Sequence, residues 1–285
     1  ILVLPWLIGF CIFKLYPFVS SLIYSFTDYD LFKGVQNVVG FQNYIDAFTK
    51  PKNIKALQVT FTYAFMTVPL KLIFALFIAY ILNFRIKGVG LFRTAYYVPS
   101  ILGGSVAIAV LWKALFKNDG VVNTILAMLG FESINFLADK QWALFIICLL
   151  RVWQFGSAMV LFLAALKGVP EDLYEAASID GATRGRQFMS ITIPLISPVI
   201  FYNLVTQLVQ AFQEFNGPYI ITNGGPRNAT TLISLIVYNT AFKDYKVGMS
   251  SAMAWVMFVI VMVLTIIAFV SQKKWVYYSD DDGRG

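Results

Sequence analysis

The feature that most constrains this chain is the length of its uncharged apolar runs. No charged residue lies between Lys246 and Lys273, and Arg186 and Glu214 enclose a second long uncharged stretch. A helix needs about 20 apolar residues to cross the hydrocarbon layer of a bilayer. Runs of this length therefore predict membrane-spanning helices.

We expect six such spans and an all-α fold, a polytopic membrane helix bundle with six transmembrane helices. Only 13% of the residues are charged, against roughly 25% in soluble domains. The first run could be mistaken for a secretory signal, but it lacks a small-residue cleavage site, so we interpret it as a retained helix. Because the chain opens on Ile1 rather than Met, we also expect a preceding segment. The six spans are residues 2–26, 57–83, 94–116, 142–166, 198–216 and 248–271.

Composition excludes several classes of site. There is no histidine, and histidine is the commonest metal ligand and general base near neutral pH. Cys11 and Cys148 both lie in apolar runs, so neither a disulfide framework nor a metal site is expected. The net charge is +7, but the basic residues are scattered between apolar blocks. They therefore predict contact with anionic lipid heads rather than with nucleic acid.

Six spans place the loops alternately on two sides of the membrane. One side holds residues 85–93, an insert after Lys167 and the tail from Lys273; the other holds residues 27–56, 117–141 and 217–247. The short loop with Arg85, Lys87 and Arg93 has three cations and no acid. Cytoplasmic loops are enriched in such cations, so we assign the first side to the cytoplasm.

The insert contains the unusual stretch YEAASIDGATRGRQFMSITIPL, residues 174–195. Pro170 suits the first position of a helix, with Glu171 and Asp172 in the first turn. Gly181 provides a stop, and two prolines, Pro194 and Pro198, bracket the start of the next span. Small residues on an exposed helix allow another surface to approach closely, but an ordinary solvated loop helix would have the same pattern.

The insert resembles the EAA motif of the permease subunits of binding-protein-dependent ABC importers. That motif reads Glu-Ala-Ala, three residues, Gly, nine residues, then Ile-x-Leu-Pro. Residues 175–177, Gly181 and residues 191–194 keep both spacings, with Ile193 in place of the Leu. The flanking Pro170, Leu173, Tyr174 and residues 179–182 are similar to the carbohydrate-uptake branch of the family.

Other parts of the chain agree with this resemblance. Residues 93–116 and 120–123 resemble the start of the family's core, and residues 222–234 resemble the Gly-Gly-Pro loop of many sugar permeases. The resemblance covers roughly residues 60–271. It divides the chain into residues 1–56, with the first helix and outer loop; residues 57–271, the permease core; and residues 272–285, a cytoplasmic tail.

The resemblance implies a role for the insert. Residues 170–190 would form the coupling helix, which docks in a groove of a separate ATPase subunit. Glu175 would meet a basic residue of the ATPase, and Pro194 would transmit motion into the spans. The coupling residues are then Glu175, Ala176, Ala177, Asp180, Gly181 and Pro194.

The resemblance also implies partners and a location. They are a second homologous permease, two ATPase subunits that carry ATP and Mg, an extracytoplasmic sugar-binding protein, and lipids of the bacterial cytoplasmic (inner) membrane. This chain would bind no cofactor or metal and have no catalytic residue, and its sequence has no Gly-x-x-x-x-Gly-Lys-Ser/Thr phosphate loop.

Polar residues inside spans mark a candidate substrate pathway, because such residues usually face a bundle interior or a water-filled path. Asn203, Gln207, Gln210 and Glu214 are spaced by four, three and four positions and so share one helix face. A weaker stripe contains Thr60, Thr67 and Lys71, and Arg151, Trp153 and Gln154 cluster in the fourth span.

These polar residues have more than one interpretation. Amides suit sugar hydroxyls and Trp153 could stack on a sugar, but the same groups could instead bond neighbouring helices. Lys71 and Arg151 could snorkel or pair with Glu214. If they face the path unpaired, an acidic oligosaccharide such as a uronate oligomer becomes the favoured cargo. The competing functions are an ion-gradient-driven secondary sugar transporter and a membrane enzyme acting on lipid or glycan.

Overall fold

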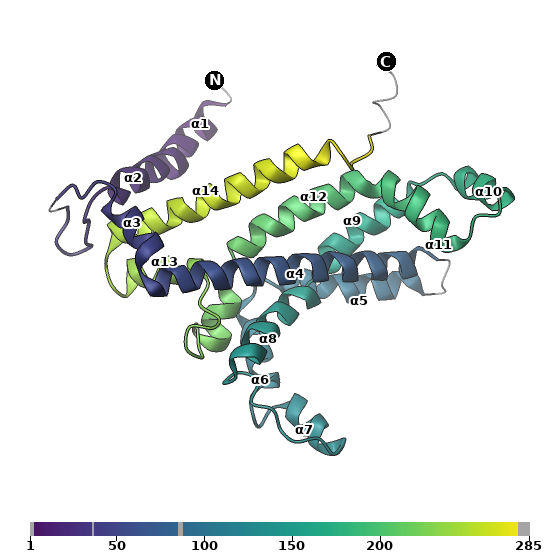
Figure 1. The fold of residues 1–285 in the computed structure, drawn as a ribbon, viewed down its shortest axis with the longest axis horizontal. Helices are drawn as coiled ribbons and strands as arrows, with labels where there is room; N and C mark the ends of the chain where they lie inside the picture. Colours follow the sequence, from purple (N-terminus) through teal and green to yellow (C-terminus); the bar gives the residue numbers. More distant parts are fainter. Residues whose placement is uncertain (1–2, 36, 85–87, 279–285) are drawn as a thin grey trace.

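A computed structural model of the chain describes residues 3–35, 37–84 and 88–278. Every named element within these residues is a helix, which confirms the expected all-α class. Long helices α4 (Pro51–Asn83), α12 (Ile193–Phe212) and α14 (Val247–Gln272) run side by side (Figure 1). The short helix α10 (Glu171–Ile179) lies at one end of the bundle, and α3 (Gln42–Thr49) lies at the other.

Four helical stretches are long and apolar enough to cross a membrane. The first combines α1 (Leu4–Phe10), η1 (Cys11–Leu15) and α2 (Tyr16–Ser25). The second is α4 and the fourth is α14. The third runs from Arg184 to Phe212 through α11 (Arg184–Gln187), η2 (Phe188–Thr192) and α12. It begins well before residue 198, so Pro194 and Pro198 lie inside a continuous helical stretch and do not bracket its start as predicted.

The two remaining predicted spans are broken rather than straight. Helices α5 (Val89–Leu102) and α6 (Val106–Leu115) meet at 104°, and α8 (Lys140–Trp153) and α9 (Gly156–Lys167) meet at 44°. If each bent pair counts as one span, the described part of the chain holds six. The predicted span over residues 94–116 is therefore not one straight helix, because the chain turns at Gly103–Ser105.

The two breaks lie against each other and satisfy each other's backbone groups. The Ser100 hydroxyl accepts from the N–H of Ser157 at 3.0 Å and donates to the carbonyl of Gln154 at 3.1 Å. The Gln154 amide donates to the carbonyl of Gly103 at 3.1 Å. Free backbone groups are costly inside a membrane, so these side chains make the breaks tolerable.

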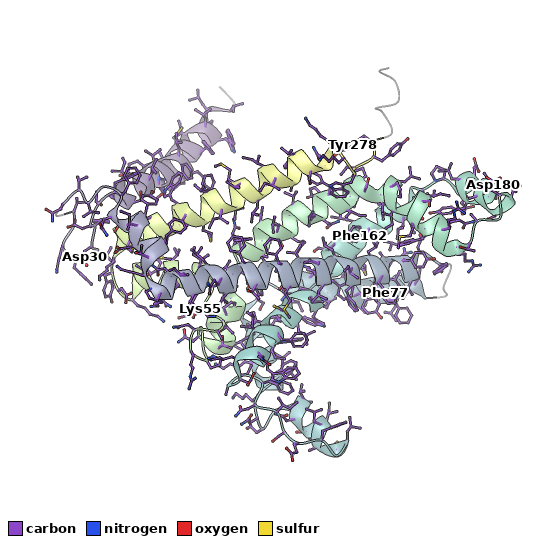
Figure 2. All side chains as sticks on the ribbon, in the orientation of Figure 1. Asp30, Lys55, Phe77, Phe162, Asp180 and Tyr278 are labelled. Atoms are coloured by element: carbon purple, nitrogen blue, oxygen red, sulfur yellow. The ribbon has the colours of Figure 1, made fainter. Side chains whose placement is uncertain are left out.

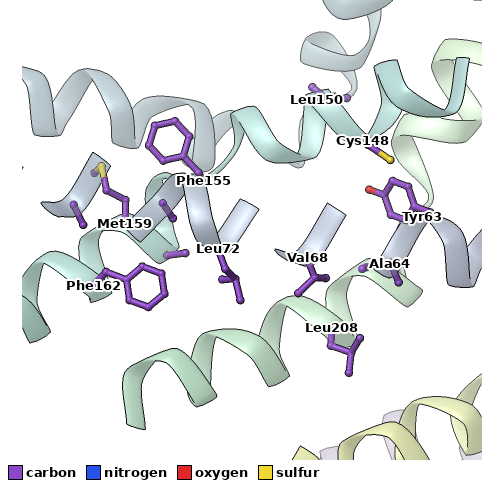
Figure 3. Packing of buried hydrophobic residues seen from close by; sticks show 14 of the residues in the cluster. Tyr63, Ala64, Val68, Leu72, Cys148, Leu150, Phe155, Met159, Phe162 and Leu208 are labelled. Atoms are coloured by element: carbon purple, nitrogen blue, oxygen red, sulfur yellow. The ribbon is translucent and has the colours of Figure 1, made fainter. Parts of the chain in front are cut away.

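Helix α4 forms the centre of the core. Figure 3 shows its side chains Tyr63, Val68 and Leu72 in the same apolar cluster as Phe155 and Phe162 of the bent α8–α9 pair. All five are buried. Burial of this apolar face fixes the position of the polar side chains that share α4.

The N-terminal helices pack on the bundle from outside. The Phe18 ring lies 4.7 Å from the Trp255 ring, and the Trp255 indole N–H donates to the Ser21 hydroxyl at 3.2 Å. At the outer end a Cβ on Gly248 would lie 2.1 Å from the carbonyl oxygen of Thr27, so this contact requires glycine. The side chains of α1 and η1 are mostly exposed and apolar, as expected for a lipid-facing helix.

The predicted outer loops contain helices of their own. Residues 117–141 hold α7 (Val121–Met128), and residues 217–247 hold η3 (Pro218–Thr222) and α13 (Ile233–Phe242). Ile233 and Ile236 of α13 are buried against the bundle, so only part of this segment is free to form an outer surface. Arg85 and Lys87, on which the predicted orientation rested, lie outside the described residues.

Candidate functional site

The predicted coupling segment forms a separate exposed helix. Helix α10 begins at Glu171, one position later than predicted, with Pro170 as its N-cap, and Glu171 and Asp172 lie in its first turn. Gly181 ends it at φ +75°, where the Ala182 N–H donates to the carbonyl of Ala177 at 2.9 Å. Only glycine adopts this left-handed conformation without strain, so the sequence-based role of Gly181 as a stop agrees with the geometry.

Helix α10 protrudes from the bundle, but side-chain hydrogen bonds join it to the N-terminal end of α12, which we call the base of α12. The Tyr174 and Thr192 hydroxyls lie 2.7 Å apart, and Thr192 is buried. The Gln187 amide donates to the Ser178 hydroxyl at 2.9 Å and to the Ala182 carbonyl at 3.2 Å. A force on α10 therefore reaches the α11–α12 stretch through several side chains.

The predicted coupling residues lie together on this protrusion, at the end where Figure 2 labels Asp180. Pro194 lies apart from them, inside the third membrane-spanning stretch. Sequence reasoning missed Ile179, which is 87% exposed; the signal was a large apolar residue two positions before the glycine stop. Glu175, Ala176, Asp180 and Gly181 are exposed, while Ala177 and Pro194 are half-buried.

The polar stripe of α12 divides into a buried half and an open half. Asn203 and Gln207 are buried. The Asn203 amide donates back to the carbonyl of Val199 at 3.1 Å. The Gln207 side chain accepts from the Lys71 ammonium group at 2.7 Å, so Lys71 is held between α4 and α12. Gln207 therefore bonds a neighbouring helix, whereas Asn203 bonds its own.

The open half of the stripe meets Arg151. The Arg151 guanidinium donates to Gln210 at 2.6 Å and to Gln154 at 3.1 Å, and it lies 3.9 Å from the Glu214 carboxylate. These contacts bring together residues of α8 and α12 that the sequence only placed on separate spans. The result is a cation held mainly by neutral amides.

A surface hollow of about 250 Å³ opens beside this cluster. The Asn216 amide closes one side by donating to the carbonyl of Gly104 at 3.1 Å. The hollow is open, so a second surface would be needed to enclose a cargo there. Its lining residues are Arg151, Gln210, Gln213, Glu214, Phe215 and Asn216.

Five predicted pathway residues do not line this hollow: Asn203, Gln207 and Lys71, described above, and Trp153 and Gln154. Trp153 packs on Trp112 with ring centroids 5.6 Å apart, and Gln154 is buried at the helix break. In the weaker stripe, Thr60 accepts from the Ile233 N–H at 2.9 Å, which anchors the start of α13. Thr67 is buried in α4.

The charges of the spans are strongly unequal. The six predicted spans contain four cations, Lys14, Lys71, Lys113 and Arg151, and one acid, Glu214. Sequence reasoning missed Lys113, which donates to the carbonyl of Ile220 at 3.0 Å and so ties α6 to η3. A polar residue in an apolar run was the available signal.

Taken with the broken spans and the exposed α10, this geometry fits the fold of a multi-pass membrane permease. Residues 45–275 match the family described as "Binding-protein-dependent transport system inner membrane component". The chain therefore belongs to this family and is an ABC transporter permease of the inner membrane.

Curated relatives match along almost the whole chain. The probable ABC transporter permease protein YesP of Bacillus subtilis is 46% identical over 282 residues, 98% of this chain and 91% of that protein. The trehalose/maltose transport system permease protein MalF of Thermococcus litoralis is 34% identical, covering 94% of this chain and 90% of that protein. The sn-glycerol-3-phosphate transport system permease protein UgpA of Yersinia pestis is 36% identical, with 98% and 95% covered.

Solved structures share the fold. One chain of a bacterial alginate ABC transporter, crystallised in complex with an alginate pentasaccharide-bound periplasmic protein, has a TM-score of 0.82 at 24% identity. The match covers 96% of this chain and 93% of that chain. The likeness extends over the broken spans as well as the straight ones.

Proposed function

We propose that this chain is the transmembrane subunit of an ATP-driven importer of sugars, that it forms half of the translocation pathway, and that α10 couples it to a separate ATPase subunit. The observation that carries the coupling role is the exposed α10, which ends on a left-handed Gly181 and is bonded to the base of α12. An isolated solvated helix would not need these bonds to a membrane span. Membership of the permease family supports the same role.

The other half of the pathway is assigned to a second, similar permease. The hollow beside Arg151 is open on one side, and a polar surface in the middle of a bilayer is costly unless something covers it. A partner permease with a matching polar face would cover it. Two ATPase subunits, ATP and Mg, and an extracytoplasmic sugar-binding protein complete the proposed assembly.

The cargo we propose is an oligosaccharide with acidic groups, such as a uronate oligomer. Lys71 and Arg151 are bound mainly by neutral amides, and Glu214 lies 3.9 Å from Arg151. Two cations and one acid leave the cluster with a net positive charge, which would attract a carboxylate in a low-dielectric pathway. The amides supply donors and acceptors for hydroxyls. The alginate importer named among the structural relatives takes an acidic sugar, which agrees with this choice.

The mechanism we propose is alternating access. The loaded binding protein docks on the outer segments, and closure of the ATPase pair moves α10 toward the bundle axis. The bonds from Tyr174 and Gln187 carry this motion into the α11–α12 stretch. Helix α12 carries Gln207 and Gln210, so its movement would change their hydrogen bonds with Lys71 and Arg151.

The test is purification of the intact complex from its own membranes in mild detergent, followed by reconstitution into liposomes. We expect an ATPase and a second permease to co-purify, and uptake of oligogalacturonate to require ATP and the binding protein. A neutral oligosaccharide of equal length serves as the control cargo. Uptake driven by an ion gradient without ATP would contradict the proposal and favour a secondary transporter. Equal uptake of both sugars would contradict only the acidic cargo.

A further inference from the structure

The segment that follows α14 turns back onto the base of α12. The carbonyl of Gln272 accepts from the N–H groups of Trp275 at 3.1 Å and Val276 at 2.9 Å, which turns the chain off the helix axis. The Trp275 ring then lies edge-on to Phe201 of α12, with centroids 6.1 Å apart. Figure 2 shows Tyr278 beside the N-terminal end of α12. We call residues 273–278 the C-terminal strap.

The strap is bonded to α12 where the helix has lost a backbone donor. Pro198 has no N–H, so the carbonyl of Pro194 lacks its usual helical partner. The Ser197 hydroxyl donates to this carbonyl at 2.6 Å, and its oxygen accepts from the N–H of Tyr277 at 2.8 Å. Ser197 is 2% exposed. One buried hydroxyl therefore replaces the missing hydrogen bond to the Pro194 carbonyl and also binds the strap.

The strap also faces the chain that leads into the coupling helix. An open hollow of about 490 Å³ lies between Tyr277 and Tyr278 of the strap, the start of α12, and residues 168–170, which join α9 to α10. Val169 of this junction is buried. The strap, the junction and the base of α12 therefore surround one space at the coupling end of the molecule.

We propose that Ser197 is a positioning residue of the transport cycle, which holds the C-terminal strap on α12 so that the coupling junction and α12 move together. This inference rests on the proposed function, because it needs an ATPase that moves α10. Two prolines within five positions weaken the helical ladder at the base of α12. Without the strap, motion from α10 would bend α12 at this point instead of shifting it as a body.

The experiment measures sugar imported per ATP hydrolysed by the whole complex in liposomes, with its binding protein. Ser197→Ala removes the hydroxyl and Tyr277→Pro removes the N–H from the other end of the same bond. Ser197→Thr and Tyr277→Phe keep these groups and serve as matched controls. We expect each disruptive variant to lower the import-to-ATP ratio about threefold or more while ATP hydrolysis continues, and both controls to keep the ratio.

The double variant Ser197→Ala with Tyr277→Pro should be no worse than Ser197→Ala alone, because Ser197→Ala already breaks the link to the strap. Unchanged ratios in Ser197→Ala and Tyr277→Pro would overturn the proposal, as would a loss in Tyr277→Phe equal to that in Tyr277→Pro. If Ser197→Ala does not assemble, Tyr277→Pro decides the matter, because it lies in the strap and not in a span. Failure of the unaltered complex to capture an ATPase would instead overturn the proposed function.

Discussion

The ammonium group of Lys71 donates to the Gln207 side-chain oxygen at 2.7 Å, across 136 positions of sequence. Both side chains are buried, and they join the two helices at the centre of the bundle. A buried cation bound to a neutral amide keeps most of its charge uncompensated. This relationship leads to the first two predictions.

Replacing Lys71 with Met should leave the complex at least as stable and reduce uptake of an acidic sugar. Met has a similar volume and carries no charge, so the cost of burying the ammonium group disappears. Uptake of oligogalacturonate should fall by about tenfold or more, which corresponds to roughly 1.4 kcal/mol of lost stabilisation. Thermal unfolding and liposome uptake measure the two effects. Lys55→Met, an exposed site on the same helix, should change neither.

Replacing Gln207 with Leu should destabilise the bundle. The change leaves the Lys71 ammonium group without its acceptor, which costs about 1–3 kcal/mol for a buried donor. Gln207→Glu restores the acceptor, so stability should recover, but its carboxylate neutralises Lys71 and should lower uptake of the acidic sugar. A Gln207→Glu complex that imports the acidic sugar at the unaltered rate would show that Lys71 does not contact the cargo.

Replacing Gly181 with Ala should weaken the capture of the ATPase. A side chain at φ +75° costs about 1–2 kcal/mol, which frays the end of α10. The measurement is the amount of ATPase that co-purifies with the permease. Gly185→Ala is the matched control, because Gly185 is exposed with open space around it and has no positive φ. Equal capture by both variants would remove Gly181 from the coupling surface.

Replacing Gly156 with Ala should separate the two broken spans. The added Cβ would lie 2.3 Å from the carbonyl oxygen of Tyr96, so α5 and α9 must move apart. Overpacking of this kind costs about 1–3 kcal/mol, seen as a lower unfolding temperature. Gly104→Ala has open space at the neighbouring break and should be tolerated. An unchanged unfolding temperature for Gly156→Ala would contradict the close crossing of the breaks.

The outer helix α3 should loosen at low pH. The hydrogen bond and ion pair with Lys50, helped by the Gln42 amide, hold the pKa of the Asp46 carboxyl below its usual range. A lowered folded pKa stabilises α3 above the unfolded value of about 3.9, and this contribution is lost as the pH falls through the folded value. Amide exchange across residues 42–49 measures the change. Asp46→Asn should remove the pH dependence, and Asp119→Asn should keep it.

Several elements were predictable from the sequence because their signals are local. The length of the uncharged run before Lys273 is enough to predict α14. The acidic first turn and Gly181 are enough to predict α10. The same local rules predicted a span over residues 94–116 but not its break. The break depends on hydrogen bonds between Ser100 and Gln154 and the backbone of the other broken span, and no local pattern reports such a partner.

The sequence by itself determined the class of this protein: six apolar spans, one polar insert with the motif of the family, and polar residues on one face of the fifth span. The length of an apolar run and the spacing of polar residues along a helix depend only on residues that are close in sequence, so both can be predicted without the tertiary structure. Only the tertiary structure decided which polar residues face the hollow and which bond their neighbours. Asn203 and Gln210 share a face in sequence, yet Asn203 is buried and Gln210 meets Arg151. That division depends on how far α4 and α8 cover α12, which is set by the packing of distant helices.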